Sequence, residues 1–160
     1  MASPEPGIVF PIHDLRTEEG EPAPAVRGET LYAFFHTDCP TSELAIPLLE
    51  RLRRIGEGRG LSVVAVSQDD PGETAAFLER LDAEIETLYD PLPWKASEAL
   101  RLSCVPTFVS VGRSGRVEKT VVGLQKERLE AFAERAALLA GRASRPFFRP
   151  EENVPAIRPG

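Results

Sequence analysis

The stretch Thr30–Ile55, which reads TLYAFFHTDCPTSELAIPLLERLRRI, decides how this chain folds. Leu31–Phe35 predict a buried strand, because apolar and aromatic residues run together until the polar tripeptide that follows stops them. After Ser42, large apolar residues recur at helical spacing, at positions 44, 48, 52 and 55, and the arginines fall outside that stripe. The stretch therefore predicts a strand that passes through a cysteine into an amphipathic helix.

Cys39 is expected where the strand gives way to the first turn of the helix. Unpaired backbone N–H groups and the helix dipole favour an anion there, and the thiolate is an anion. A protonated His36 nearby would help, whereas Asp38 and Glu43 oppose a negative charge. A free cysteine is more often just a small buried residue. The helix-start position and the Pro-Thr-Ser that follows favour a nucleophile.

These residues, with two later motifs, resemble the thioredoxin-like superfamily, and within it the redoxin branch of TlpA, ResA and AhpC/TSA-type proteins. Cys39–Ser42 stand where the family carries Cys-x-x-Cys, and Pro47 stands where thioredoxins carry the proline that kinks this helix. Val105–Phe108 look like the segment that holds the family's cis-proline, at Pro106. The long separation of the two motifs is similar to that of the redoxin branch. The resemblance covers roughly residues 28–140.

The resemblance implies an α/β fold, a three-layer sandwich with a mixed central sheet flanked by helices. It implies that Cys39 attacks disulfides or peroxidic oxidants. Pro40, Thr41, Val105 and Pro106 would form the substrate groove. The partner would be a protein or peptide disulfide, or a small thiol such as glutathione, and an antioxidant activity would follow. No cofactor is implied.

Ser42 is the sharpest departure from the family's pattern, because it replaces the resolving cysteine. A serine hydroxyl cannot attack a mixed disulfide on Cys39 at neutral pH. Three explanations stay open: a natural monothiol protein, a lineage that has abandoned catalysis, and a serine introduced to trap an intermediate. Asp38 stands in place of the family's tryptophan, and Ala33 in place of its buried acid. Dithiol turnover therefore lacks two further parts.

Cys104 lies two residues before Pro106, so the predicted fold brings it near Cys39. It is a possible second redox cysteine that would resolve an adduct on Cys39. The alternative is a partly buried loop cysteine, and it is favoured because a disulfide needs a Cα separation below roughly 7 Å.

Two other functions compete with that of a thiol-disulfide oxidoreductase. The first is a thiol peroxidase of the AhpC/TSA type, whose motif is Pro-x-x-x-Thr-x-x-Cys. Here Tyr32 and His36 occupy the proline and threonine positions, and Thr37 is one residue out of step. The second is a non-catalytic binding module that uses the same groove.

The rest of the chain predicts the α/β sandwich independently of the resemblance, because strands alternate with helices and a hairpin and a helix follow. We divide the chain into an irregular lead-in with a short edge strand (1–27), a thioredoxin-like domain (28–140) and an extended proline-rich tail (141–160). The tail is expected to dock through its two adjacent phenylalanines. Further strands are expected at 61–66 (central), 85–89, 107–111 and 116–122 (at the sheet edge). Further helices are expected from Asp70, at 95–102 and at 129–139.

Composition limits the partners. The net charge is −6 and the pI about 5.1, which argues against nucleic acid and against an anionic membrane surface. No apolar run is long enough for a membrane span, and two cysteines and two histidines offer no metal-ligand spacing. Because the N-terminus has neither a basic start nor an apolar core, we expect a cytoplasmic protein. The oligomeric state is left open.

Overall fold

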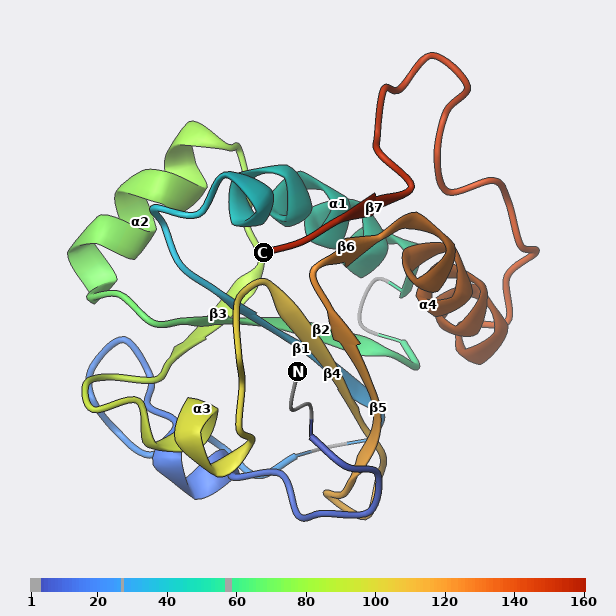
Figure 1. Cartoon of the computed structure of the whole chain (residues 1–160). Helices are drawn as coiled ribbons and strands as arrows, with labels where there is room; N and C mark the ends of the chain where they lie inside the picture. Colours follow the sequence, from blue (N-terminus) through green and yellow to red (C-terminus); the bar gives the residue numbers. More distant parts are fainter. Residues whose placement is uncertain (1–3, 27, 57–58) are drawn as a thin grey trace.

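A computed structural model describes residues 4–26, 28–56 and 59–160, and its centre is a five-stranded mixed sheet (Figure 1). Residues 1–3 and 27 of the predicted lead-in lie outside the described part. The strands follow the order β3-β2-β1-β4-β5. Their bounds are β1 Thr30–Phe35, β2 Ser62–Ser67, β3 Glu86–Tyr89, β4 Thr107–Val111 and β5 Val117–Val122.

Strand β1 occupies the middle of the sheet. It runs parallel to β2 and antiparallel to β4, and all six of its residues are buried. Alternate side chains therefore enter two separate cores: Leu31, Ala33 and Phe35 one, Tyr32 and Phe34 the other. Such a strand has no solvent-facing side, which explains its unbroken apolar sequence.

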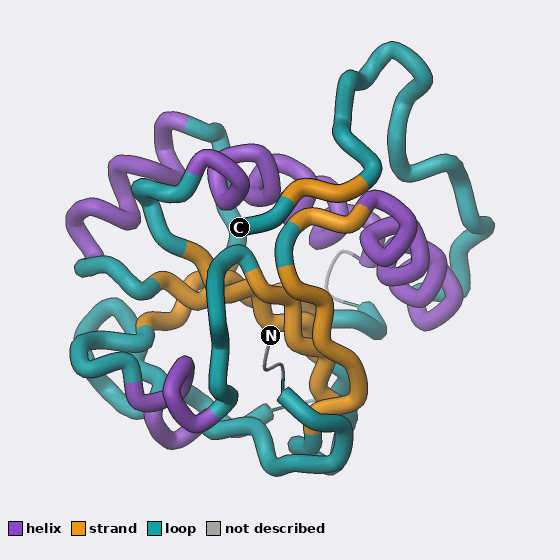
Figure 2. Tube along the Cα trace, viewed as in Figure 1, coloured by secondary structure: helices purple, strands orange, loops and turns teal. Residues whose placement is uncertain are grey.

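Helices cover one face of the sheet (Figures 1 and 2). Helices α1 (Pro40–Gly56) and α4 (Lys126–Leu139) pack there side by side, and α2 (Pro71–Arg80) stacks Phe77 on Phe35 with ring centroids 5.7 Å apart. The fold class is the three-layer α/β sandwich that the sequence predicts. Helix α2 begins after Asp70, as predicted, and Asp70 caps it by accepting a hydrogen bond from the Glu73 amide at 2.8 Å.

The opposite face is covered by the N-terminal segment and the short helix α3 (Lys95–Ala99). Phe10 is buried and stacks on Tyr32 with centroids 4.1 Å apart. The segment contains a 3₁₀ turn, η1 (Ile12–Asp14), and isolated bridges. Helix α3 is shorter than the predicted 95–102, because Arg101 adopts a left-handed φ of 53° and ends it. Strand β5 lies at the sheet edge, as predicted.

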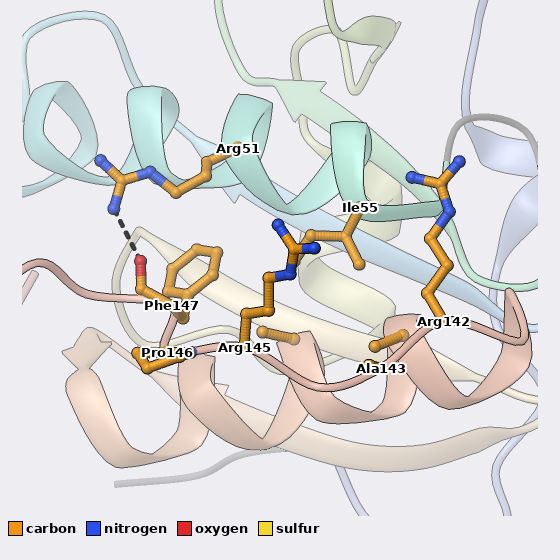
Figure 3. A pocket seen from close by; sticks show the side chains of 9 residues that line it. Arg51, Ile55, Arg142, Ala143, Arg145, Pro146 and Phe147 are labelled. Atoms are coloured by element: carbon orange, nitrogen blue, oxygen red, sulfur yellow. Dashed lines mark hydrogen bonds between the residues drawn. The ribbon is translucent and has the colours of Figure 1, made fainter.

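The segment that follows α4 folds back onto the domain. Phe147 and Phe148 are both buried, with rings 5.0 Å apart, which confirms the predicted docking. Figure 3 shows the Arg51 side chain reaching from α1 to this segment, where it donates to the Phe147 carbonyl at 2.9 Å. Arg51 also forms two hydrogen bonds to Glu152, at 2.9 and 2.8 Å. Further on, β7 (Ile157–Arg158) pairs with β6 (Leu124–Gln125).

Within the described residues, none of the helices combines the length and the apolar character needed to cross a membrane.

Replacing Phe147 and Phe148 together by alanine should lower the free energy of unfolding by about 3 kcal/mol, because two buried rings are lost. The expected decrease is close to that for a single ring, because the segment can detach from the domain before the domain itself unfolds. Leu138→Ala on α4 is the control: that side chain is 68% exposed, so its change should stay within about 0.5 kcal/mol. Urea denaturation measures both. Equal stability of the double variant and the parent would show that the rings do not hold the segment.

The Arg51–Glu152 ion pair should make this docking sensitive to acid. Hydrogen bonds from Arg51, and then from the Arg149 amide, lower the pKa of Glu152 from 4.5 to about 2. Because the folded pKa lies below the unfolded one, the contribution is complete above about pH 4.5 and disappears as the pH falls toward 2. Glu152→Gln should therefore lower the melting temperature at pH 7 but not at pH 2. The exposed Glu151→Gln is the matched control, and a Glu152→Gln deficit that persists at pH 2 would contradict the assignment.

Candidate active site

The loops that follow the parallel strands meet at one edge of the sheet, which is where α/β folds place their sites. Cys39 follows β1 and immediately precedes α1, while Asp69 follows β2. The segment before β4, which contains Val105 and Pro106, reaches the same edge because β4 is the antiparallel neighbour of β1. Residues distant in sequence are thus gathered around one sulfur atom.

The Cys39 sulfur lies between a donor and an acceptor. The Ser42 amide points at Sγ at 3.4 Å, and the thiol donates to the Val105 carbonyl, also at 3.4 Å. The Ser42 amide is one of the unpaired N–H groups of the first helical turn, so it can stabilise the thiolate. The Cys39 side chain is partly exposed.

Ser42 lies one turn into α1, and its side chain is completely buried. Its hydroxyl accepts a hydrogen bond of 3.5 Å from the His36 amide, so it links the end of β1 to the helix start. The backbone amide of Ser42 therefore donates to the Cys39 sulfur, while its hydroxyl accepts from the loop before the helix. No second thiol stands at the resolving position.

Asp69 is a site residue that the sequence reasoning missed. One carboxylate oxygen accepts from the Thr37 amide at 2.7 Å, and the other lies 3.4 Å from Nε2 of His36. Nδ1 of His36 accepts from the Asp38 amide at 3.1 Å. Both imidazole nitrogens thus have partners other than the Cys39 sulfur, and through them His36 stabilises the conformation of the loop. The signal was available: Asp69 directly follows a parallel strand, at the edge where Cys39 is expected.

The Val105–Pro106 peptide bond is cis, the isomer expected from the sequence. The Pro106 carbonyl accepts a hydrogen bond from the Gly123 amide at 2.8 Å, which fixes this loop to the end of β5. The Val105 carbonyl thereby faces the cysteine.

Cys104 and Cys39 are both free thiols in the structure. The Cys104 carbonyl accepts from the Thr107 hydroxyl at 2.8 Å, which orders the turn before β4. Cys104 is partly buried and lines a surface hollow of about 510 Å³ together with Trp94, Leu102 and Val105. The hollow lies directly beside the Val105 backbone.

The predicted groove residues have different surroundings. Pro40 is exposed as the first residue of α1. Thr41 is buried, and its hydroxyl donates to the Pro159 carbonyl at 2.8 Å and accepts from Nε of Arg158 at 3.1 Å. The C-terminal segment thus reaches the start of α1, a contact that the sequence did not predict.

The described residues contain no cluster of three or more histidine, cysteine, aspartate or glutamate side chains that could hold a metal ion.

Comparison with known proteins found no matching family model and no matching curated protein. Solved structures do match. A Chlorobium tepidum protein provisionally designated the thiol:disulfide interchange protein DsbE aligns over 86% of this chain and 99% of its own, with a TM-score of 0.70 and 23% identity.

Two further structures agree. A secreted Mycobacterium tuberculosis disulfide oxidoreductase homologous to E. coli DsbE aligns over 78% of this chain and 93% of its own, with a TM-score of 0.62 and 17% identity. A thiol:disulfide interchange protein of the thioredoxin family from Chlorobium tepidum TLS aligns over 88% and 98%, with a TM-score of 0.62 and 17% identity. These similarities extend over most of each chain. The chain therefore shares the thioredoxin-like fold of these structures.

Proposed function

We propose that the chain is a thiol-disulfide oxidoreductase that acts through a single nucleophile, Cys39. The observation that supports this most directly is the position of the sulfur, 3.4 Å from the Ser42 amide at the start of a helix. A thiolate formed there gains a charge-assisted hydrogen bond and the favourable end of the helix dipole. The solved structures that share the fold include proteins described as disulfide oxidoreductases and interchange proteins.

The reaction is thiol-disulfide exchange. The Cys39 thiolate attacks one sulfur of a partner disulfide, so a Cys39–S bond forms as the partner's S–S bond breaks. The departing thiolate takes up a proton from water. The thiolate of a small thiol such as glutathione then attacks the partner's sulfur in the mixed disulfide. An S–S bond forms between the small thiol and the partner as the Cys39–S bond breaks, and Cys39 leaves as a thiolate. An external thiol is needed because the neighbouring Ser42 offers only a hydroxyl.

The substrate class follows from the surroundings of Val105. Its backbone lies beside the nucleophile, where an extended protein or peptide segment can pair with it. The adjacent hollow with Trp94 and Cys104 offers room for a side chain of that segment. Trp94 is 38% exposed there, and its indole N–H donates to the Gln68 carbonyl at 3.1 Å, which holds the ring at the mouth of the hollow.

Oxidised glutathione should modify the protein on Cys39, because only this sulfur has the helix-start amide as a donor. Intact mass should show one added glutathione, and tryptic mapping should place it on the peptide 28–51 rather than on 102–113. Cys39→Ser should abolish the adduct, and Cys104→Ser should retain it. Modification of Cys104 with Cys39 left free would overturn the assignment.

Ser42→Cys should convert the protein into a dithiol reductase. Residues 39 and 42 lie one helical turn apart and face the same side, so a thiol at position 42 can reach an adduct on Cys39. The variant should reduce insulin with catalytic dithiothreitol, clearly faster than the parent. Ser42→Ala is the matched control: it also loses the hydroxyl, and with it the acceptor for the His36 amide, but it gains no thiol and should not exceed the parental rate. If the Ser42→Cys protein forms its internal disulfide but does not reduce insulin, the groove is a binding surface and not a catalytic one.

A further inference from the structure

Ile157–Gly160 run from β7 toward the start of α1, the helix that directly follows Cys39 (Figure 1). The segment begins as β7, which pairs antiparallel with β6: Ile157 lies opposite Gln125, and Arg158 lies opposite Leu124. The Lys126 amide donates to the Ala156 carbonyl at 2.9 Å and extends this pairing. Backbone hydrogen bonds thus guide the segment along the surface from α4 to the start of α1.

At the start of α1 the segment makes polar contacts with Thr41, which lies two residues after the nucleophile. The Thr41 hydroxyl donates to the Pro159 carbonyl at 2.8 Å, and Nε of Arg158 donates to that same hydroxyl at 3.1 Å. Thr41 is 4% exposed. The segment therefore forms hydrogen bonds with a buried side chain of the predicted substrate groove, in addition to its backbone pairing with β6.

Close backbone approach shows how tightly the segment fits. A Cβ atom at Gly160 would overlap the Val105 carbonyl group. A Cβ at Gly123 would lie 2.7 Å from the Arg158 carbonyl oxygen. Glycine at both positions allows the two backbones to meet. The carbonyl that Gly160 approaches is the one that accepts the Cys39 thiol proton.

We propose that Ile157–Gly160 are an internal ligand of the thiol groove, which an extended partner segment must displace before its disulfide reaches Cys39. The inference rests on the proposed function, since it regulates the same site. Three of the predicted groove residues, Thr41, Val105 and Pro106, border the segment. A bulky peptide disulfide needs the Val105 backbone and competes with Gly160, so detachment of the segment sets the rate of exchange.

The same contacts define what a competing partner must resemble. It is an extended segment with a carbonyl that accepts from the Thr41 hydroxyl and a donor group that binds the same hydroxyl. At the Val105 carbonyl it has a glycine, because a side chain does not fit there. The separate peptide Val-Pro-Ala-Ile-Arg-Pro-Gly, which copies residues 154–160, meets these requirements.

Gly160→Val tests the proposal in the intact chain, because a valine side chain at position 160 cannot fit against Val105. Ala156→Val is the matched control, since that side chain in the same segment is exposed. The probe is oxidised glutathione, a peptide disulfide, and tryptic mass mapping reports the Cys39 adduct alone. Amide exchange at Lys126, whose N–H donates to the Ala156 carbonyl, shows whether the segment has detached. If the valine at position 160 is accommodated and the segment stays attached, a variant that ends at Ala156 removes the segment altogether.

We expect Cys39 in Gly160→Val to form the adduct about tenfold faster than in the parent, because the hydrogen bonds that hold the segment are worth a factor of that order. Ala156→Val should match the parent. The peptide 154–160, added to the variant that ends at Ala156, should restore the slow rate. Equal rates with the segment attached and detached would overturn the proposal while leaving Cys39 a nucleophile. A Cys39 that forms no adduct in any variant would overturn the proposed function as well.

Discussion

The position of the Cys39 sulfur between the Ser42 amide and the Val105 carbonyl is the arrangement on which the rest of the site depends. Val105 lies 66 positions from Cys39 in the sequence, whereas Ser42 lies only three positions away. The two distant residues meet because β1 and β4 are paired neighbours, with Phe34 opposite Thr107 at the end nearest the site. Since both strands are buried, a slip of one residue would turn core side chains outward, so the register is fixed. The sheet thus holds the acceptor opposite the nucleophile.

A second set of contacts orders the loop that carries the cysteine. Asp69 accepts from the Thr37 amide, the Ser42 hydroxyl accepts from the His36 amide, and the His36 ring accepts from the Asp38 amide. Three successive backbone N–H groups before Cys39 therefore have partners. Because its donors already have partners, the loop needs little reorganisation when the thiolate forms, and the site is in this sense preorganised. Ser42 contributes to this order although it cannot resolve a disulfide.

Much of the fold could be predicted, because it rests on local patterns. The unbroken apolar run of β1, the stripe of α1 and the cap of α2 by Asp70 are visible in neighbouring residues. Buried aromatics such as Phe147 and Phe148 could be predicted to dock, since rings are costly to leave in water. The end of α3 could not, because it depends on the left-handed backbone of Arg101, a residue type that seldom signals a turn.

The candidate site was predictable only in part. Cys39 and Pro106 belong to motifs that can be read along the chain. Asp69 acts through contacts with a different loop, and the contact between Thr41 and Pro159 spans 118 positions. No periodicity specifies a single hydroxyl–carbonyl pair at that separation. Its cause is the pairing of β6 with β7, two short strands of only two residues each, which carry too little sequence pattern to be recognised.

The most direct test of Cys39 as the activated thiol compares it with Cys104 in the same molecule. The protein is treated briefly with iodoacetamide, once folded and once in urea, and peptide mapping gives the ratio of Cys39 to Cys104 alkylation. The geometry predicts a ratio well above one in the folded protein, because only the Cys39 sulfur faces the Ser42 amide. It also predicts a fall to about one on unfolding, when both thiols are free in solvent. A ratio at or below one in the folded protein would contradict the account.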